Sequence, residues 1–337
     1  MQLVVSCDYL ISPAFCAPEE LTACVESLIQ IKRSIENNLN NIVIEENALE
    51  KLAELGCYPC AQIFNHNLQS ISECTYTGRD IARTVNNILA LELEEECRFP
   101  VHVADWTNKK ADPELIGRAP SRSPALLDML ESISLSTIFF KKNYSVLHHP
   151  TCGGNTVTFS GELASLLPET QDTLPQNILA VVSVLPDYDA FALGQDAKTL
   201  FDQATDTQSI LSSFYAGALA ILNQRQIKNS KFNFDSFEFG PHFVDSLDEN
   251  QCGPGQNFSG PLFDSICHVL VKLEKNEVSP FYTDTTRKTQ RKRANGDLAW
   301  RTHITKGNPA LRLLFWTDAE EKIILANVGK KNDLEIL

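Results

Sequence analysis

The chain places a histidine among several cations near its C-terminus. The segment DLAWRTHIT (297–305) alternates in the way that a β-strand does, so Arg301 and His303 are expected on the same side of it. The next apolar segment, ALRLLFWTD (310–318), adds Arg312 in the same alternation. We therefore expect one face of a C-terminal sheet to display two arginines and a histidine.

Two lysines, Lys330 and Lys331, follow the last apolar segment and are expected at the edge of that face. Cleavage of RNA by its own 2′-hydroxyl requires a base, an acid for the leaving 5′-oxygen and cations for the phosphorane. Histidine, arginine and lysine supply such groups. The candidate catalytic set is Arg301, His303, Arg312, Lys330 and Lys331. The alternative is a solvated, charged sheet face that binds another protein.

A second basic feature is the segment TRKTQRKRAN (286–295), which precedes these strands and is expected to form a loop. Its cations could contact RNA phosphates. The alternative is a loop that keeps the chain soluble or becomes ordered on binding. The candidate nucleic-acid-binding residues are Arg287, Lys288, Arg291, Lys292 and Arg293.

Carboxylates follow several predicted strands in the N-terminal part: Asp8, Asp105, Asp187 and Asp189. If those strands are parallel neighbours, the carboxylates meet at one sheet edge, where they would hold Mg²⁺ or Mn²⁺ for nuclease chemistry. Polar residues are also common at strand ends without any such role. No other cofactor is expected, because the sequence contains no phosphate-binding loop, dinucleotide fingerprint, nucleophile elbow or HExxH motif.

Cysteine-containing motifs leave further alternatives open. CYPC (57–60) has the spacing of a zinc or redox site, with His66, Cys74 and Cys97 as the nearest additional ligands. HHPTC (148–152) gathers two histidines and a cysteine at a predicted strand end. The alternatives are an ordinary turn and ordinary loop residues. The ten cysteines are spread widely, and we expect mostly free, buried thiols.

Composition predicts a protein with a sizeable core, since 43% of its 337 residues are hydrophobic and 21% are charged. We expect no membrane span, because the chain lacks a run of about 18 apolar residues. Asp8 interrupts the first apolar run and no basic segment precedes it, which does not fit a signal peptide and favours a cytoplasmic location. The net charge of −14 opposes nucleic-acid binding by the whole surface.

Charge is distributed unevenly along the chain. Residues 1–249 hold 16 Lys and Arg against 33 Asp and Glu, whereas residues 250–337 hold 13 against 10. This difference favours a second domain with its own partner surface.

Strands and helices are mixed in the first part of the chain, which is typical of an α/β domain with a mixed or parallel sheet. A loop is expected at 107–124 and a short strand followed by a helix at 155–169. Predicted strands cover 3–11, 99–106, 136–142, 143–149 and 177–189. Predicted helices cover 18–38, 45–56, 77–96, 123–134 and 195–227.

The C-terminal part predicts a small α+β domain. A helix at 262–277 precedes three strands at 297–305, 310–318 and 321–329, and the short connections between the strands predict an antiparallel meander.

This order of helix, basic loop and meander resembles the RelE/ParE-like toxin fold, which includes ribosome-dependent messenger-RNA nucleases. LRLLFW (311–316) is similar to the family's Arg-centred third strand, and IILANVGKKND (323–333) to its last strand followed by Lys. HFVDSL (242–247) would supply the first strand. The resemblance implies that Arg301 and Arg312 bind phosphate. It also implies that His303 and either Lys330 or Lys331 carry protons.

We therefore expect two domains, 1–240 and 241–337. The leading hypothesis is an interaction subunit of a bacterial toxin or phage-defence assembly, which binds a protein partner, and RNA as well, through the C-terminal sheet. An RNA-cleaving effector is the alternative. A metal-dependent nuclease using the N-terminal carboxylates is the second alternative.

Overall fold

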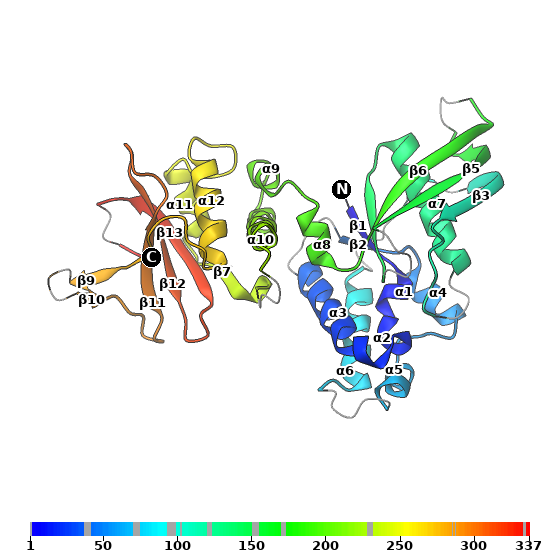
Figure 1. The fold of residues 1–337 in the computed structure, drawn as a ribbon, viewed down its shortest axis with the longest axis horizontal. Helices are drawn as coiled ribbons and strands as arrows, with labels where there is room; N and C mark the ends of the chain where they lie inside the picture. The colour runs from blue at the N-terminus through cyan, green and yellow to red at the C-terminus, as the bar shows by residue number, and fades with distance from the viewer. Residues whose placement is uncertain are drawn as a thin grey trace. The chain divides into compact units, whose positions relative to one another are not determined.

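The computed structural model divides into two compact units, Met1–Phe191 and Ala192–Leu337, which are described separately (Figure 1). This division differs from the predicted boundary at 240. Residues 192–240 belong to the second unit because helix α10 (Thr207–Gln224) packs against α12 (Ser259–Leu270) and strand β7 (Phe237–Phe239) pairs with β13 (Ile323–Lys330). The structure describes residues 2–36, 42–69, 75–92, 99–101, 103–119, 123–149, 155–169, 173–227, 232–284, 286, 288–332 and 335–337.

The first unit contains a six-stranded mixed sheet in the order β2-β1-β4-β6-β5-β3. The first four strands in this order run parallel, and β5 and β3 add antiparallel pairs. This confirms the predicted α/β class with a mixed sheet. The strands are β1 (Gln2–Val5), β2 (Ile42–Ile44), β3 (Val103–Asp112), β4 (Tyr144–Leu147), β5 (Thr156–Leu167) and β6 (Gln176–Leu185).

Helix α7 packs one face of this sheet, where Leu126, Leu130 and Ile133 share a core with Val146 and Phe159. The helices of this part are α1 (Cys7–Leu10), α2 (Ser12–Phe15), α3 (Leu21–Glu36), α4 (Ala48–Glu54), α5 (Ala61–Leu68), α6 (Gly78–Glu92), α7 (Ser123–Phe140) and α8 (Tyr188–Leu193), together with the 3-10 turn η1 (Pro18–Glu20).

Several predicted elements of this unit were wrong at the level of type or length. The first strand ends at Val5, because the Ser6 side chain accepts a hydrogen bond from the Tyr9 amide and starts a helix. The predicted loop at 107–124 begins in β3, which pairs with β5 as far as Asp112. The predicted strand–helix at 155–169 is mostly the single strand β5.

The predicted strand at 136–142 is also wrong, since α7 continues to Phe140. Its β-branched and aromatic residues favour a strand locally. The helix forms here because buried Leu135 adds to its packed face. The hydroxyls of this turn find acceptors in carbonyls one turn earlier. Ser136 donates to Ser132 and Thr137 donates to Ile133.

The second unit contains a five-stranded sheet in the order β7-β13-β12-β11-β8 and a separate pair, β9 and β10. Its strands are β7 (Phe237–Phe239), β8 (Ser279–Pro280), β9 (Tyr282–Asp284), β10 (Thr289–Gln290), β11 (Leu298–His303), β12 (Leu311–Thr317) and β13 (Ile323–Lys330). Its helical elements are α9 (Ala197–Asp202), α10 (Thr207–Gln224), η2 (Phe234–Ser236), α11 (Phe243–Glu249) and α12 (Ser259–Leu270).

The predicted antiparallel meander is confirmed, because β11 pairs with β12 and β12 pairs with β13 (Figure 1). HFVDSL does not supply a strand, since Phe243–Glu249 is the helix α11, which packs against β13. The expected basic loop holds the short β9–β10 pair. The predicted helical region at 195–227 divides in two, where Asp206 and Ser209 form a capping box that starts α10.

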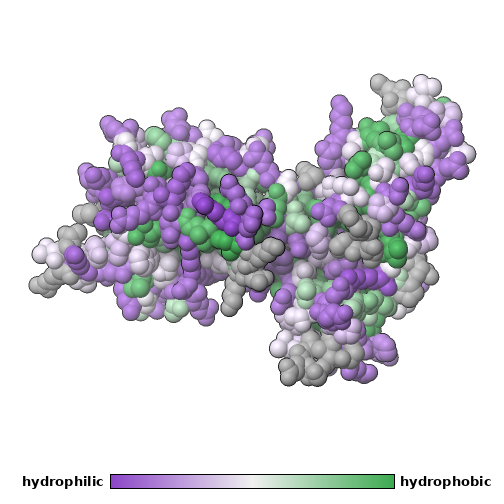
Figure 2. Space-filling model, viewed as in Figure 1, coloured by the Kyte–Doolittle hydropathy of each residue, from purple (hydrophilic) through white to green (hydrophobic). Residues whose placement is uncertain are grey.

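None of the helices in the described part of the chain is long and apolar enough to cross a membrane. In the view of Figure 2, hydrophilic side chains gather over the second unit, with smaller hydrophobic patches between them.

Candidate nucleic-acid interface

The register of β11 and β12 decides which side chains share a face of the second sheet. His303 pairs with Arg312, and Arg301 pairs with Leu314. Directly paired residues, and every second residue along a strand, point to the same side. Arg301, His303 and Arg312 therefore lie on one face, as their alternation predicts. Their catalytic role stays a prediction.

Backbone contacts fix the end of this face. The Arg312 Nη1 atom donates a hydrogen bond to the Lys331 carbonyl over 3.1 Å, and the Lys331 amide donates to the Ala310 carbonyl over 2.8 Å. Gly329 pairs with Arg312 and presents no side chain there. The Arg312 guanidinium is thus held beside the residue that follows β13.

Positive charge dominates the local electrostatics. Burial lowers the pKa of His303, and Arg312, Lys306 and Lys331 lower it further, whereas a hydrogen bond with the Thr305 backbone opposes them. Burial also lowers the pKa of Arg312, and the Arg301 charge adds to this effect. Each of these cations is close enough to disfavour another positive charge. We call Arg301, His303, Lys306, Arg312 and Lys331 the cationic face.

The cationic face has no neutralising acid among the residues that the structure describes: no carboxylate there forms an ion pair with any member. Other lysines of the same unit are paired, since Lys272 contacts Glu321 and Lys275 contacts Asp264. Crowded cations without a counter-charge favour the binding of an anion, which would relieve their mutual repulsion.

Lys330 does not join this face in the way the sequence predicted. It pairs with Leu311, so its side chain leaves the sheet on the side opposite to Arg312. Lys331, one residue later, is the lysine that contributes to the field at His303. Lys306 was missed by the sequence argument, because it lies in the turn after β11, outside the strand alternation.

The basic segment 286–295 is not one continuous binding surface. Lys288 and Lys292 are exposed and Arg291 is half-buried, whereas Arg287 lies outside the described residues. Arg293 lies over the Trp316 ring, 4.5 Å from its centre, and its Nη1 is 3.7 Å from Asp297. These contacts use Arg293 to cover the sheet, and its role in nucleic-acid binding stays a prediction.

The other end of the same face is apolar and covered. Trp316 packs there with Leu314 and Ile324, and Ile336 from the end of the chain packs against them. The Asn327 Oδ1 atom accepts a hydrogen bond from the Leu337 amide over 3.1 Å, which holds this end in place. One face of the sheet is therefore divided between a closed apolar end and an open cationic end.

The four N-terminal carboxylates do not gather as predicted. Asp105 lies within β3 at the far edge of the sheet, where it accepts a hydrogen bond from Ser165. Asp187 accepts the Ala190 amide, and Asp189 accepts the Gln30 amide group. No group of three His, Cys, Asp or Glu residues in the described ranges could hold a metal ion. The predicted metal-dependent nuclease site is thus absent from that part of the chain.

Asp8 instead belongs to a buried polar cluster at the ends of β1 and β4. Its carboxylate accepts the Arg118 and Ala119 amides, both over 3.1 Å, and lies 3.8 Å from the Nδ1 atom of His148. His149 stacks on Tyr9 with ring centres 4.5 Å apart. This cluster ties the segment after β3 to two neighbouring parallel strands. The HHPTC motif was the sequence signal for it, although its pairing with Asp8 was not predicted.

The CYPC motif forms a turn before α5. Cys57 is buried and its thiol donates to the Leu55 carbonyl over 3.5 Å, whereas Cys60 is exposed at the N-cap of the helix. Two of the additional zinc ligands considered, Cys74 and Cys97, lie outside the described residues.

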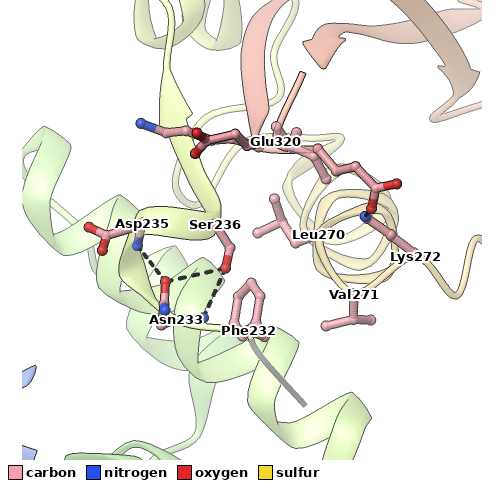
Figure 3. Close-up of a pocket in the computed structure, with 11 residues that line it drawn as sticks. Phe232, Asn233, Asp235, Ser236, Leu270, Val271, Lys272 and Glu320 are labelled. Atoms are coloured by element: carbon pink, nitrogen blue, oxygen red, sulfur yellow. Dashed lines mark hydrogen bonds and ion pairs between the residues drawn. The ribbon is translucent and has the colours of Figure 1, made fainter. Parts of the chain in front are cut away.

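A cavity of about 470 Å³ lies between η2, the end of α12 and the turn before β13 (Figure 3). Its polar groups are already engaged. Asn233 accepts hydrogen bonds from the Asp235 amide and the Ser236 hydroxyl, and Lys272 is paired with Glu321. Because these groups satisfy one another, the cavity is a weaker candidate for a ligand than the cationic face.

Comparison with known proteins adds no relative, since no family model, curated protein or solved structure matches this chain.

Proposed function

We propose that the second unit acts as a separate RNA-binding domain that holds the phosphate backbone through the cationic face. The observation that carries this proposal is the grouping of Arg301, Arg312, Lys306 and Lys331 around His303, with no acidic partner among the described residues. Phosphates interact favourably with such a group because they neutralise it and release counterions.

One feature supports RNA as the anion. The cationic face lies on β11 and β12, which belong to the meander that resembles the RelE/ParE-like toxin fold. The net charge of −14 makes the protein as a whole repel nucleic acid, so binding would be confined to a local basic surface. The same resemblance supports a place in a bacterial toxin or phage-defence assembly. There, an acidic protein partner would compete with RNA for the same arginines.

Binding of a fluorescein-labelled single-stranded RNA to the full chain tests the proposal by anisotropy. Arg301→Ala combined with Arg312→Ala is expected to weaken binding by roughly 10-fold or more, as two phosphate contacts are lost. The matched control is Lys272→Ala combined with Lys275→Ala, which removes the same charge from paired positions. Equal binding by the two double variants would refute the proposal.

A second candidate function, RNA cleavage, is favoured by the state of His303. Its lowered pKa keeps the imidazole neutral at about pH 7, in the form that accepts a proton. Arg301 and Arg312 on the same face could stabilise the charge of a phosphorane. The histidine would take the 2′-hydroxyl proton while the 2′-oxygen attacks phosphorus. The bond from phosphorus to the 5′-oxygen would break, the 5′-oxygen would take a proton from Lys331 or water and leave as a hydroxyl, and the other product would end in a 2′,3′-cyclic phosphate.

Cleavage is tested with RNA in the presence and absence of ribosomes. We expect His303→Ala to reduce the rate by about 100-fold, the usual contribution of a general base, while RNA binding is retained. Substrates with 2′-deoxyribose should bind but remain intact. Cleavage of the deoxy substrate, or an unchanged rate in His303→Ala, would exclude this mechanism.

A further inference from the structure

The charges of the cationic face gather at one end of the second sheet. His303 and Arg312 are directly paired across β11 and β12, and Arg301 precedes His303 by two residues on the same face. The Arg312 Nη1 atom donates to the Lys331 carbonyl over 3.1 Å, so Lys331 lies at the same end. A protein that follows the interior of a nucleic-acid strand needs cations spaced along a track. Here they form a compact group instead.

The turn between β11 and β12 holds Lys306 at this end of the sheet. The amides of Ile304 and Thr305 both donate to the Leu311 carbonyl, over 2.9 and 3.3 Å, which is the pattern of a β-bulge. The Thr305 hydroxyl donates to the Pro309 carbonyl over 2.6 Å and accepts the Leu311 amide over 2.9 Å. These bonds fix the turn, and with it the position of the Lys306 backbone.

The opposite side of the cationic face is closed. Leu314 pairs with Arg301 on one side and with Asn327 on the other. The Asn327 side chain holds the segment 335–337, since its Nδ2 atom donates to the Glu335 carbonyl over 3.4 Å and its Oδ1 atom accepts the Leu337 amide over 3.1 Å. This covering segment reaches the row of the sheet that contains Arg301. A strand bound to the cationic face therefore cannot continue along the sheet in that direction.

The guanidinium groups lie deeper than the ammonium groups. Arg301 and Arg312 are half-buried, whereas Lys306 and Lys331 are exposed. A guanidinium offers several N–H donors in a planar fork that matches a phosphate group, whereas an ammonium acts as a point charge. Gly329, the partner of Arg312, has no side chain that would occupy the face there. The inner positions thus suit a compact group of high charge, and the outer positions suit the chain attached to it.

We propose that the cationic face binds the phosphorylated end of an RNA strand instead of its interior, an inference that rests on the RNA-binding function proposed above. A terminal phosphomonoester carries roughly −1.5 to −2 charges at pH 7, whereas an internal phosphodiester carries a single negative charge. Arg301 and Arg312 bind the terminal phosphate. Lys306 and Lys331 bind the phosphates that follow, as the strand leaves the sheet on the side of the turn.

The experiment measures anisotropy of one RNA oligonucleotide with an internal fluorescein label, prepared with two hydroxyl ends, with a 5′-phosphate, with a 3′-phosphate, or as a circle. Titration of the full chain at about pH 8 keeps the monoester fully ionised. We expect one of the phosphorylated forms to bind roughly 10-fold more tightly than the hydroxyl form, because it gains charge-assisted hydrogen bonds. The circle should bind no more tightly than the hydroxyl form.

The possible failures separate this inference from the function on which it rests. Equal affinities of all linear forms, or a circle that binds as tightly as the phosphorylated form, would overturn the preference for an end. Such a result would point to internal phosphates, which RNA cleavage requires, and RNA binding itself would stand. Absence of RNA binding, or binding that Arg301→Ala combined with Arg312→Ala leaves unchanged, would refute both proposals.

Two double variants test the assigned positions. Arg301→Ala combined with Arg312→Ala should bind the phosphorylated and hydroxyl forms equally. Lys306→Ala combined with Lys331→Ala should weaken the binding of both forms and keep their ratio. A lysine variant that loses the preference, or an arginine variant that keeps it, would contradict these positions. All four side chains are exposed or half-buried, so we expect both variants to fold, which thermal unfolding checks.

Discussion

Loss of two arginines from the cationic face should flatten the salt dependence of RNA binding. The cationic face holds four permanent cations besides His303: Arg301, Lys306, Arg312 and Lys331. Each phosphate neutralised on a single strand contributes roughly −0.7 to the slope of log K against log salt, so the wild-type slope should be about −2.8. Arg301→Ala combined with Arg312→Ala should reduce it to about −1.4.

This difference is large enough to measure. Between about 50 and 200 mM salt, wild-type affinity should fall roughly 50-fold and that of the double variant roughly 7-fold. Fluorescence anisotropy at several salt concentrations gives both slopes, with Lys272→Ala combined with Lys275→Ala as the control. Those lysines already have acidic partners, so the control should keep the wild-type slope. A slope unchanged by the arginine substitutions would refute the assignment of these residues to phosphate contacts.

The remaining predictions concern single groups. RNA binding should tighten as the pH falls through the lowered pKa of His303, since the protonated ring adds a cation, and His303→Ala should abolish this change in anisotropy titrations. Burial, with the charges of Arg118 and His148, lowers the pKa of His149 to about 3. The unfolded chain therefore binds more protons, and stability should fall by about 1.4 kcal/mol per pH unit from pH 6.5 toward 3. Denaturant unfolding of His149→Phe, measured at several pH values, should lack this fall in stability. Asp8→Ala should lower the free energy of unfolding by roughly 2–5 kcal/mol, because two amides lose their acceptor. Asp8→Asn keeps one acceptor oxygen and should lower it less. Equal stabilities of the two variants in urea would contradict this account. Arg293→Ala should lower the free energy of unfolding by about 1 kcal/mol and shift the tryptophan fluorescence, because Arg293 lies over Trp316. Lys292→Ala should do neither, because the Lys292 side chain is exposed.

Strand alternation in the C-terminal part was sufficient to predict its sheet. The segments 297–305 and 310–318 each have regular alternation and end at short turns, and the register joins them as expected. The shared face of Arg301 and Arg312 follows from pleat geometry alone. A change of one residue in the pairing of two strands moves a side chain to the opposite face of the sheet. Lys330 pairs with Leu311 and lies on the face opposite to Arg312, so the sequence argument misplaced Lys330 but not Lys331.

Other features depend on contacts that local sequence does not reveal. Residues 135–140 have strand-forming side chains, yet they complete α7 because its buried face packs against the sheet. The segment 242–247 is short and mixes apolar with polar residues, a pattern that is ambiguous between strand and helix, and its packing on β13 decides for helix.

Asp105 is separated from Asp8 for a topological reason. Asp8 and Asp105 each lie in or directly after a strand, but β1 and β3 are separated by β4, β6 and β5 in the sheet. Strand order in a mixed sheet depends on long-range pairing, so spacing along the chain does not predict it.

Photo-cross-linking of an RNA containing 4-thiouridine to the full chain, followed by mass spectrometry of the linked peptides, tests the central claim most directly. The cross-links are expected in β11 and β12, on peptides that contain or adjoin Arg301 and Arg312, and they should disappear with Arg301→Ala combined with Arg312→Ala. Cross-links confined to the first unit, or unchanged in the double variant, would contradict the account.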